Sequence, residues 1–341
     1  MINISKTISY FLLFLVLLFN IYCSNDSSKS GSRLMPNCTG KSGEIVLVME
    51  EQKWKSNIGD SINDWFSQEY SILPQPEMTF KLVQIPYNAF NDIFKPHRNI
   101  IFVYIGENYK TNSVTIETNK WSAPQKVVTM QSPNTTSFLE LFAKVRKQIY
   151  DSLVIAEIGR FHSNYKTFPM IPIITELRKK HFIDITVPKG YVKDVDLQDF
   201  VWISQETPTT SQGILVYYYP YKSVKDFSTD ALIRKRDSML LQHVPGPSEG
   251  SYMATERRMP VLRREFTENG VYICELRGLW QVVGDFMGGP FVSRSMVDTL
   301  RNRVVTVEGF VYAGKQDKRS FVWQVEAIIN SASVIYKSTE K

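Results

Sequence analysis

Three apolar runs in the last quarter of the chain decide its fold: VYICELRGLW (Val271–Trp280), GPFVSRSMVD (Gly289–Asp298) and NRVVTVEGFVYA (Asn302–Ala313). Each run is rich in β-branched and aromatic residues, which favour strands. Only short segments separate the runs, and consecutive strands joined by short connections usually pair with each other. This stretch therefore predicts a strand-dense, antiparallel region.

Similar runs occur throughout the chain, with helical segments between them. Further strands are expected at residues 43–49, 79–86, 99–106, 113–121, 125–132, 182–188, 199–206, 213–220 and 261–266. Apolar spacing and capping residues predict helices at residues 54–70, 87–96, 136–165, 174–181, 228–244 and 318–335. Strands outnumber helices, so we predict an α+β fold with mostly antiparallel or mixed sheets and packing helices, rather than a doubly wound fold. The chain could contain two similar halves.

Length and composition indicate a globular protein with a sizeable core. The 341 residues are 43% hydrophobic and 13% aromatic. We expect an N-terminal α+β half at residues 44–168 and a C-terminal α+β half at residues 169–341, which could form one domain together. The formal net charge is +6, from 40 basic and 34 acidic residues. Because this excess is mild and spread along the chain, we expect no nucleic-acid partner.

The N-terminus predicts an export signal. About fifteen mostly apolar residues run from Ile8 to Tyr22, whereas a membrane-spanning helix needs about 20. We therefore predict a signal peptide at residues 1–22, a lipidated Cys23, and a flexible tether at residues 23–43 that is rich in serine and glycine. A plain secretory signal and an uncleaved anchor are the alternatives. Tyr22 departs from the small residue that usually precedes a lipidated cysteine.

Two segments carry a resemblance to a known family. ELRGLWQVVGDFMGGPFVSRSMVD, which begins at Glu275, and NRVVTVEGFVYAGKQDKR, which begins at Asn302, resemble the Bacteroidota lipoprotein family catalogued as domain of unknown function 4837. The resemblance extends over essentially the whole mature chain. It implies a cell-envelope protein held to a membrane by a lipid anchor, on the periplasmic or the cell-surface side, and it implies no activity.

The segment from Arg277 to Phe291 is the candidate binding site. Arg277, Trp280 and Asp285 could present a cation, an aromatic face and a carboxylate together, which suits an anionic or sugar-like partner. Gly288 and Gly289 would let the backbone approach a ligand closely. The alternative is a scaffold in which the glycines shape a turn, Trp280 is core and Arg277 pairs with Asp285.

The sequence assigns no catalytic residue, metal or cofactor. GxSxG, P-loop, HExxH and CxxC motifs are absent, and the four histidines stand far apart. A binding or structural lipoprotein with a protein or glycan partner is the favoured function. The alternative is an envelope hydrolase that acts on glycan or peptide through carboxylates such as Asp285 and Glu308.

Two smaller patterns have plain structural interpretations. Cys38 and Cys274 are expected to be unrelated thiols, and a disulfide between them is the alternative. The YYYPY segment (Tyr217–Tyr221) alternates as a strand does, and a stacking platform is the alternative.

Replacing Cys23 tests the lipid anchor. In Cys23→Ala, the lipoprotein signal peptidase should leave the precursor uncleaved, and fatty-acid labelling should be lost because the acylated sulfur is absent. Metabolic labelling followed by gel electrophoresis measures both effects. Cys38→Ala is the matched control and should keep its label, whereas labelling of Cys23→Ala at the wild-type level would disprove the anchor.

Overall fold

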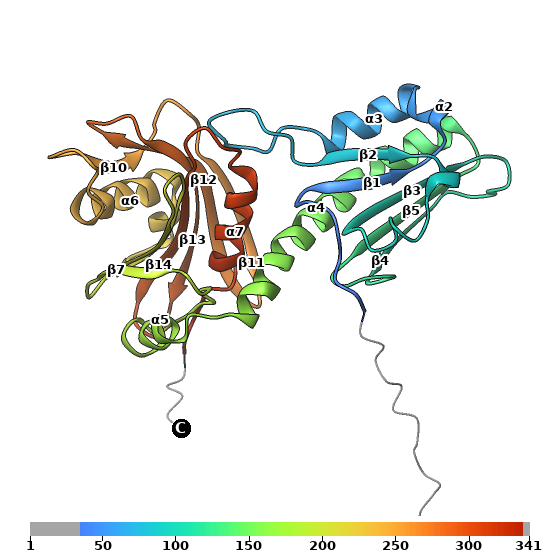
Figure 1. Ribbon diagram of the computed structural model, residues 1–341. Helices are drawn as coiled ribbons and strands as arrows, with labels where there is room; N and C mark the ends of the chain where they lie inside the picture. The colour runs from blue at the N-terminus through green and yellow to red at the C-terminus, as the bar shows by residue number, and fades with distance from the viewer. Residues whose placement is uncertain (1–34, 337–341) are drawn as a thin grey trace, which may run out of the picture. The chain divides into compact units, whose positions relative to one another are not determined.

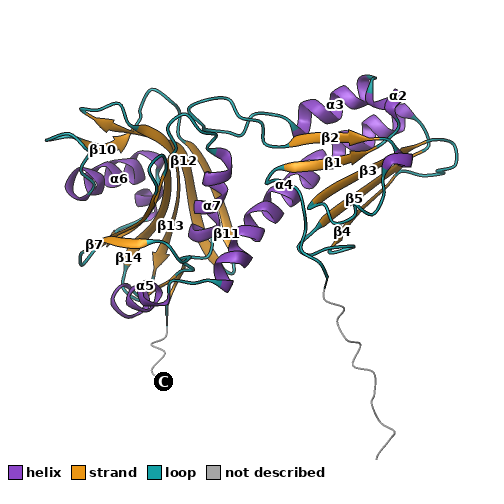
Figure 2. Cartoon of the chain, viewed as in Figure 1, coloured by secondary structure: helices purple, strands orange, loops and turns teal. Residues whose placement is uncertain are grey.

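Two β-sheets organise residues 35–336, the part of the chain that this computed structural model describes (Figures 1 and 2). From Pro36 onward the chain forms one compact unit. The signal peptide predicted at residues 1–22 and Cys23 lie outside the described residues. Among the helices of the described part, none is both long and apolar enough to cross a membrane.

The first sheet has the strand order β2-β1-β3-β5-β4. Four neighbouring strands are parallel and β4 runs antiparallel to β5 at the edge. The strands are β1 (Glu44–Val48), β2 (Lys81–Ile85), β3 (Asn99–Ile105), β4 (Ser113–Thr118) and β5 (Lys126–Ser132). β3 is almost wholly buried, as expected for a parallel strand covered on both faces, whereas β5 alternates between buried and half-buried residues.

Helices and turns connect and cover the first sheet. These elements are α2 (Glu51–Trp54), α3 (Asn57–Phe66), the 3₁₀ turn η1 (Tyr87–Ala89) and α4 (Thr135–Thr167). The side chain of Asn134 accepts a hydrogen bond from the backbone N–H of Ser137 and caps α4. At 33 residues, α4 is about 50 Å long, and it contacts β3 and β5 of the first sheet as well as α7 of the second half.

The second sheet is antiparallel throughout, in the order β10-β12-β13-β14-β9-β8-β7, with β11 beside the first part of β12. Its strands are β7 (Val192–Asp196), β8 (Phe200–Glu206), β9 (Ser211–Pro220), β10 (Tyr252–Thr255), β11 (Leu262–Glu268), β12 (Val271–Val283), β13 (Gly288–Asp298) and β14 (Arg303–Tyr312). The three runs that opened the sequence analysis are the adjacent strands β12, β13 and β14, so the antiparallel prediction is confirmed.

Helices cover both faces of the second sheet, with α6 on one face and α7 on the other (Figure 1). The remaining elements are α5 (Ile171–Glu176), η2 (Leu177–His181), β6 (Ile183–Asp184), η3 (Val224–Phe227), α6 (Thr229–His243), α7 (Arg319–Ile329) and β15 (Ser333–Val334). Under α6, the guanidinium of Arg236 donates to both carboxylate oxygens of Glu308 at 2.8 and 2.7 Å, and both side chains are fully buried. The pairing removes the cost of two isolated buried charges.

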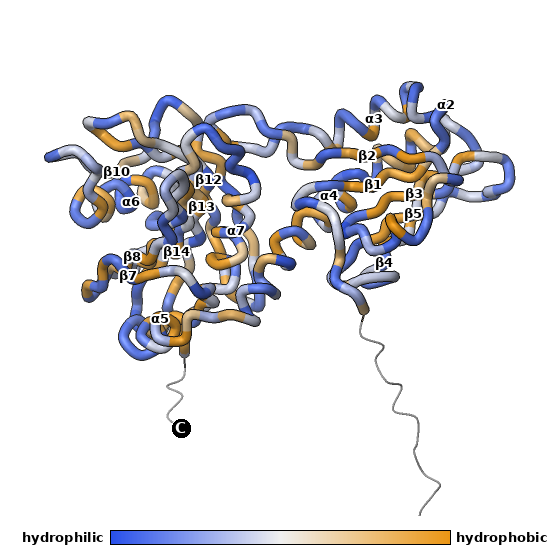
Figure 3. Tube along the Cα trace, in the orientation of Figure 1, coloured by the Kyte–Doolittle hydropathy of each residue, from blue (hydrophilic) through white to orange (hydrophobic). Residues whose placement is uncertain are grey.

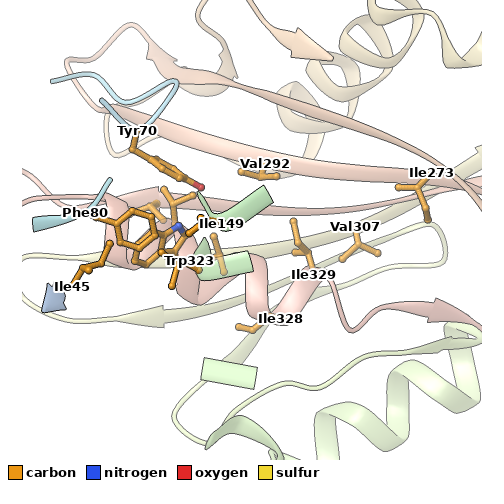
Figure 4. Packing of buried hydrophobic residues seen from close by; sticks show 14 of the residues in the cluster. Ile45, Tyr70, Phe80, Ile149, Ile273, Val292, Val307, Trp323, Ile328 and Ile329 are labelled. Carbon is orange, nitrogen blue, oxygen red and sulfur yellow. The ribbon is translucent and has the colours of Figure 1, made fainter. Parts of the chain in front are cut away.

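One hydrophobic core joins the two halves. Trp323 of α7 is fully buried and packs against Tyr70 and Phe80 of the first half, at ring-centroid distances of 5.9 and 6.0 Å (Figure 4). The same cluster reaches Val307 of β14. Apolar residues are concentrated along the strands and the inner sides of the helices (Figure 3). α7 is therefore buried between the second sheet and elements of the first half.

The α+β prediction is confirmed, with local differences. The helix expected at residues 87–96 is only the turn η1, and the helix expected at residues 318–335 ends at Ile329, because the chain then pairs with β6 through β15. The first sheet is mostly parallel and the second is antiparallel, so the topologies do not support two similar halves.

The predicted tether ends earlier than residue 43. The backbone N–H of Ala123 donates to Pro36 O at 2.9 Å, and that of Thr39 donates to Pro96 O at 2.8 Å. The prediction is wrong for residues 36–43, because their backbone hydrogen bonds attach this polar segment to the first half without apolar side chains. Cys38 and Cys274 are both free thiols, as expected.

Trp323→Ala tests the shared core. It should lower the free energy of unfolding by about 3–5 kcal/mol, because a large cavity would open between the halves. Urea denaturation followed by circular dichroism measures the loss. Ile155→Ala is the control, because Ile155 is 69% exposed on α4 and its loss should change the stability by less than about 0.5 kcal/mol.

Candidate functional site

The turn between β12 and β13 places most of the predicted site residues together. Trp280 near the end of β12 lies opposite Gly289 of β13, and Asp285 lies in the turn that joins the two strands. Trp280, Asp285, Gly288 and Gly289 all line one hollow of about 660 Å³. Four of the five predicted site residues therefore lie around the same hollow, and Arg277 does not.

Trp280 forms a wall of the site. Its side chain is buried, and its indole N–H donates to the carbonyl oxygen of Val311 at 3.2 Å. The ring packs edge-on against Phe310 at 5.7 Å. A β carbon at position 289 would overlap Val311 O and crowd the indole nitrogen, so Gly289 makes room chiefly for the Val311 carbonyl that the indole N–H bonds, rather than for a ligand.

Arg277 belongs to a different charge cluster. Its Nε donates to Glu275 at 2.8 Å, its Nη1 donates to the hydroxyl of Tyr70 at 3.0 Å, and its Nη2 pairs with Glu326 of α7. Burial raises the pKa of Glu326, and Arg277 opposes that shift. Burial alone would also raise the pKa of Glu275, but Arg277 and Arg264 hold it below its usual value. The expected pairing of Arg277 with Asp285 is therefore wrong.

Asp285 is half-buried, and its hydrogen bonds are local. Its carboxylate accepts hydrogen bonds from the Ser248 hydroxyl at 2.7 Å and from the backbone N–H of Phe286 at 2.6 Å. These two bonds lower the pKa of the carboxyl group, with the Ser248 contact the larger cause. The residue stiffens the turn and carries a full negative charge at neutral pH.

A second hollow of about 420 Å³ lies behind the first, and both hollows are lined by Trp280 and Met287. Four aromatic side chains line it: Trp202, Trp280, Phe310 and Tyr312. Three prolines, at positions 208, 245 and 247, and Met253 contribute to the rest of the wall. This aromatic hollow lies at the C-terminal end of α6 and is predominantly apolar.

The aromatic hollow contains one unused donor. The indole nitrogen of Trp202 is buried and has no hydrogen-bond partner within the described residues. The Trp202 ring packs against Phe310 at a centroid distance of 6.4 Å, which holds its position. A buried donor without a partner costs free energy, and an acceptor on a ligand would remove that cost once the side chains that cover the nitrogen move apart.

The rim of the first hollow is also apolar. Phe286 projects from the turn with its side chain fully exposed, at 106% of the reference value, and Met259 beside the same hollow is 45% exposed. Glu256 and Arg258 pair with each other at this rim. Phe286 and Met259 thus place two exposed apolar side chains beside the same hollow.

Sequence reasoning missed Trp202, Met287 and Phe310. Trp202 is in the strand predicted at residues 199–206 and Phe310 is in one of the three opening runs, so strand alternation could have placed both on one face of the sheet. Which strands are neighbours could not be deduced, because β8 and β14 are separated by β9 in the sheet but by about 100 residues in sequence.

Family models match both parts of the chain. Residues 172–331 match the family described as Domain of unknown function (DUF4837), and residues 38–166 match the family described as Domain of unknown function (DUF8532). The first match agrees with the resemblance stated from the sequence. That resemblance does not extend over the whole mature chain, because the first half matches a different family. No protein of curated function matches this chain.

Three solved structures resemble part of the chain. A mutant of the protein Mog1 has 12% identity and a TM-score of 0.31, covering 46% of this chain and 93% of its own. The Ran-binding protein Mog1p of Saccharomyces cerevisiae has 13% identity and a TM-score of 0.30, covering 45% and 90%. LpqN, involved in cell envelope biogenesis of Mycobacterium tuberculosis, has 11% identity and a TM-score of 0.27, covering 45% and 83%. TM-scores this low carry no argument about function.

Stability measurements distinguish Arg277 from Asp285. Arg277→Ala should lower the free energy of unfolding by about 3–5 kcal/mol, because Glu275 and Glu326 would lose their shared counter-ion in a buried position. Asp285→Asn should melt close to the wild type. Arg258→Ala is the matched arginine control, since its side chain is 86% exposed and an exposed pair contributes little. Wild-type stability of Arg277→Ala would refute the structural role.

Proposed function

We propose that this protein is a binding module of the bacterial cell envelope, attached to a membrane through a lipid on Cys23, and that it binds an apolar segment of a protein partner. The aromatic hollow beside Trp202 and Trp280 carries the proposal. A predominantly apolar cavity of about 420 Å³, with the unpartnered Trp202 donor in its wall, suits a ligand that buries one large apolar side chain and offers one carbonyl oxygen.

The chemistry of the hollow favours a peptide over a glycan. A sugar presents hydroxyl groups on most of its edge, and each buried hydroxyl needs a hydrogen-bond partner. The hydroxyl and carboxylate side chains of the lining, apart from that of Tyr312, are confined to the turn between β8 and β9 at residues 206–211. Four of them already bond to each other in pairs, Thr207 with Thr210 and Ser211 with Glu206. A peptide supplies both an apolar side chain and a backbone carbonyl for the Trp202 N–H.

The exposed rim extends the contact surface beyond the hollow. Phe286 and Met259 would become buried against a partner of protein size, and each apolar side chain removed from water contributes roughly 1.5–3 kcal/mol. Aromatic anchors next to a preformed pocket are typical of the strongest positions in protein interfaces. The rim and the hollow together form a contact surface with a larger area than a small molecule would cover.

The arrangement of carboxylates does not favour the hydrolase alternative. Glu308 is fully buried, pairs with Arg236 and lines neither hollow. Asp285 lines the first hollow, but its pKa is lowered, whereas a general acid needs a raised pKa. The two carboxylates therefore do not face a common substrate position.

The lipid anchor stays a proposal that rests on the sequence. The apolar run that ends at Cys23, the polar residues after it and the resemblance to a lipoprotein family support it. Residues 24–35 would then connect the lipid to the packed chain that begins at Pro36, and a protein partner would come from the envelope.

Selection from a random-peptide display library against the chain from Ser24 to Lys341 tests this function. Selected peptides should share a large apolar residue, and their binding should change tryptophan fluorescence. Trp202→Phe keeps an aromatic ring but removes the donor, so affinity should fall by up to about tenfold. Met287→Glu should abolish binding, because it places a charge between the hollows.

Ile155→Glu is the control, since it adds the same charge on an exposed part of α4. It should bind selected peptides as the wild type does. If Met287→Glu binds as tightly as Ile155→Glu does, or if glycan fragments bind and no peptide does, the proposal fails.

A further inference from the structure

A third hollow, called the cationic hollow below, lies near the N-terminal end of α6. It has a volume of about 410 Å³ and is lined by Tyr219, Pro220, Lys222, Asp226, Ala231, Arg234, Lys235 and Ser238. It shares no residue with the two hollows around Trp280. Nothing in the proposed peptide-binding function uses it.

One face of α6 supplies half of this lining. The four residues occupy positions i, i+3, i+4 and i+7 of the helix: Ala231, Arg234, Lys235 and Ser238. This spacing places them on the same side of the helix. Tyr219 and Lys222 approach from the end of β9 and the segment after it. Two chain segments therefore direct cationic side chains into one hollow.

The cations of this hollow are unpaired. Lys222 and Arg234 are exposed and Lys235 is half-buried, whereas the buried Arg236 of the same helix pairs with Glu308. Lys222, Arg234 and Lys235 form no ion pair within the described part of the chain, although they gather around one hollow. Like charges gathered in this way repel one another. Solvent screens part of this repulsion, because Lys222 and Arg234 are exposed, and a bound anion would replace it with attraction.

The one acidic residue of the lining is already engaged. A carboxylate oxygen of Asp226 accepts hydrogen bonds from the backbone N–H groups of Lys222 and Ser223, at 2.7 and 3.1 Å. It caps the turn η3 rather than neutralising the lysines. With three cations and one carboxylate in the lining, the hollow keeps a net positive charge.

Tyr219 orders the hollow and adds a donor. The ammonium group of Lys235 lies 4.9 Å from the centre of the Tyr219 ring, a cation–π contact that restrains a flexible side chain. The Tyr219 hydroxyl has no hydrogen-bond partner within the described residues. Burial, followed by the charge of Asp226, raises the pKa of this phenol, so it stays protonated and able to donate.

We propose that this hollow is an anion site that binds a phosphoryl group, with Arg234, Lys222 and Lys235 as its ligands. A guanidinium offers two parallel N–H donors that match two phosphate oxygens, and ammonium groups add point charge. A phosphoryl group accepts more hydrogen bonds than a carboxylate and carries up to twice its charge. Ser238 offers an additional hydroxyl group at the wall.

The source of the phosphoryl group is either a soluble phosphate ester or the headgroup of a phospholipid, and two assays distinguish them. The chain from Ser24 to Lys341, which lacks the lipid, is titrated with inorganic phosphate and with glycerol phosphate by calorimetry. It is also sedimented with phosphatidylcholine vesicles with or without phosphatidylglycerol. Binding in the first assay indicates a soluble ester, and binding only to phosphatidylglycerol vesicles indicates a headgroup.

Charge-matched variants make the test specific. Arg234→Gln and Lys235→Gln should each weaken binding about tenfold, the loss expected for one charge-assisted hydrogen bond. Lys225→Gln removes the same charge from an exposed neighbour outside the lining and should bind as the wild type does. Ala231→Phe changes no charge and should block binding by filling the hollow, and its melting temperature shows whether it folds.

Three results would overturn the proposal. The first is no binding by the wild type in either assay. The second is equal weakening by Lys225→Gln and Lys235→Gln, which would indicate diffuse electrostatic attraction. The third is binding of acetate as tight as that of phosphate, which would exclude recognition of the phosphoryl group.

Discussion

The capping of α7 by Glu77 is the contact on which the arrangement of the two halves depends. Both carboxylate oxygens of Glu77 accept backbone N–H groups at the start of α7, from Lys318 at 2.7 Å and from Arg319 at 2.8 Å. The first turn of a helix has free N–H groups and a partial positive charge, so a carboxylate stabilises it. Because Glu77 belongs to the first half, the cap positions Trp323 in the shared core.

The position of α7 determines which face of the second sheet can carry the aromatic and cationic hollows. α7 and α4 fill one face together with the core, so α6 alone covers most of the other. A single helix of 15 residues leaves uncovered sheet at both ends. The aromatic hollow lies beyond its C-terminus at residues 244–247, and the cationic hollow lies beside Ala231 and Arg234.

Several buried carboxylates of the described residues are held in ion pairs that connect distant elements. Glu157 pairs with Arg98 and Arg160, Glu308 pairs with Arg236, and Glu326 pairs with Arg277. Each of these three carboxylates thus has a cation within a few ångströms, which offsets the cost of removing its charge from water. By contrast, the cations around Tyr219 have no ion-pair partner within the described residues. The Trp202 indole nitrogen is one of several buried polar atoms there without a hydrogen-bond partner.

The sequence alone determined the strands, most helices and the α+β class, because side-chain periodicity depends on neighbours along the chain. It also located the segment from Trp280 to Gly289, since a glycine-rich turn next to an aromatic residue is a local pattern. Only the tertiary structure decided that Arg277 pairs with Glu326 and not with Asp285, and that Trp202 and Phe310 join Trp280. These contacts connect residues tens to more than a hundred positions apart, and strand order and helix docking, rather than local propensity, bring them together.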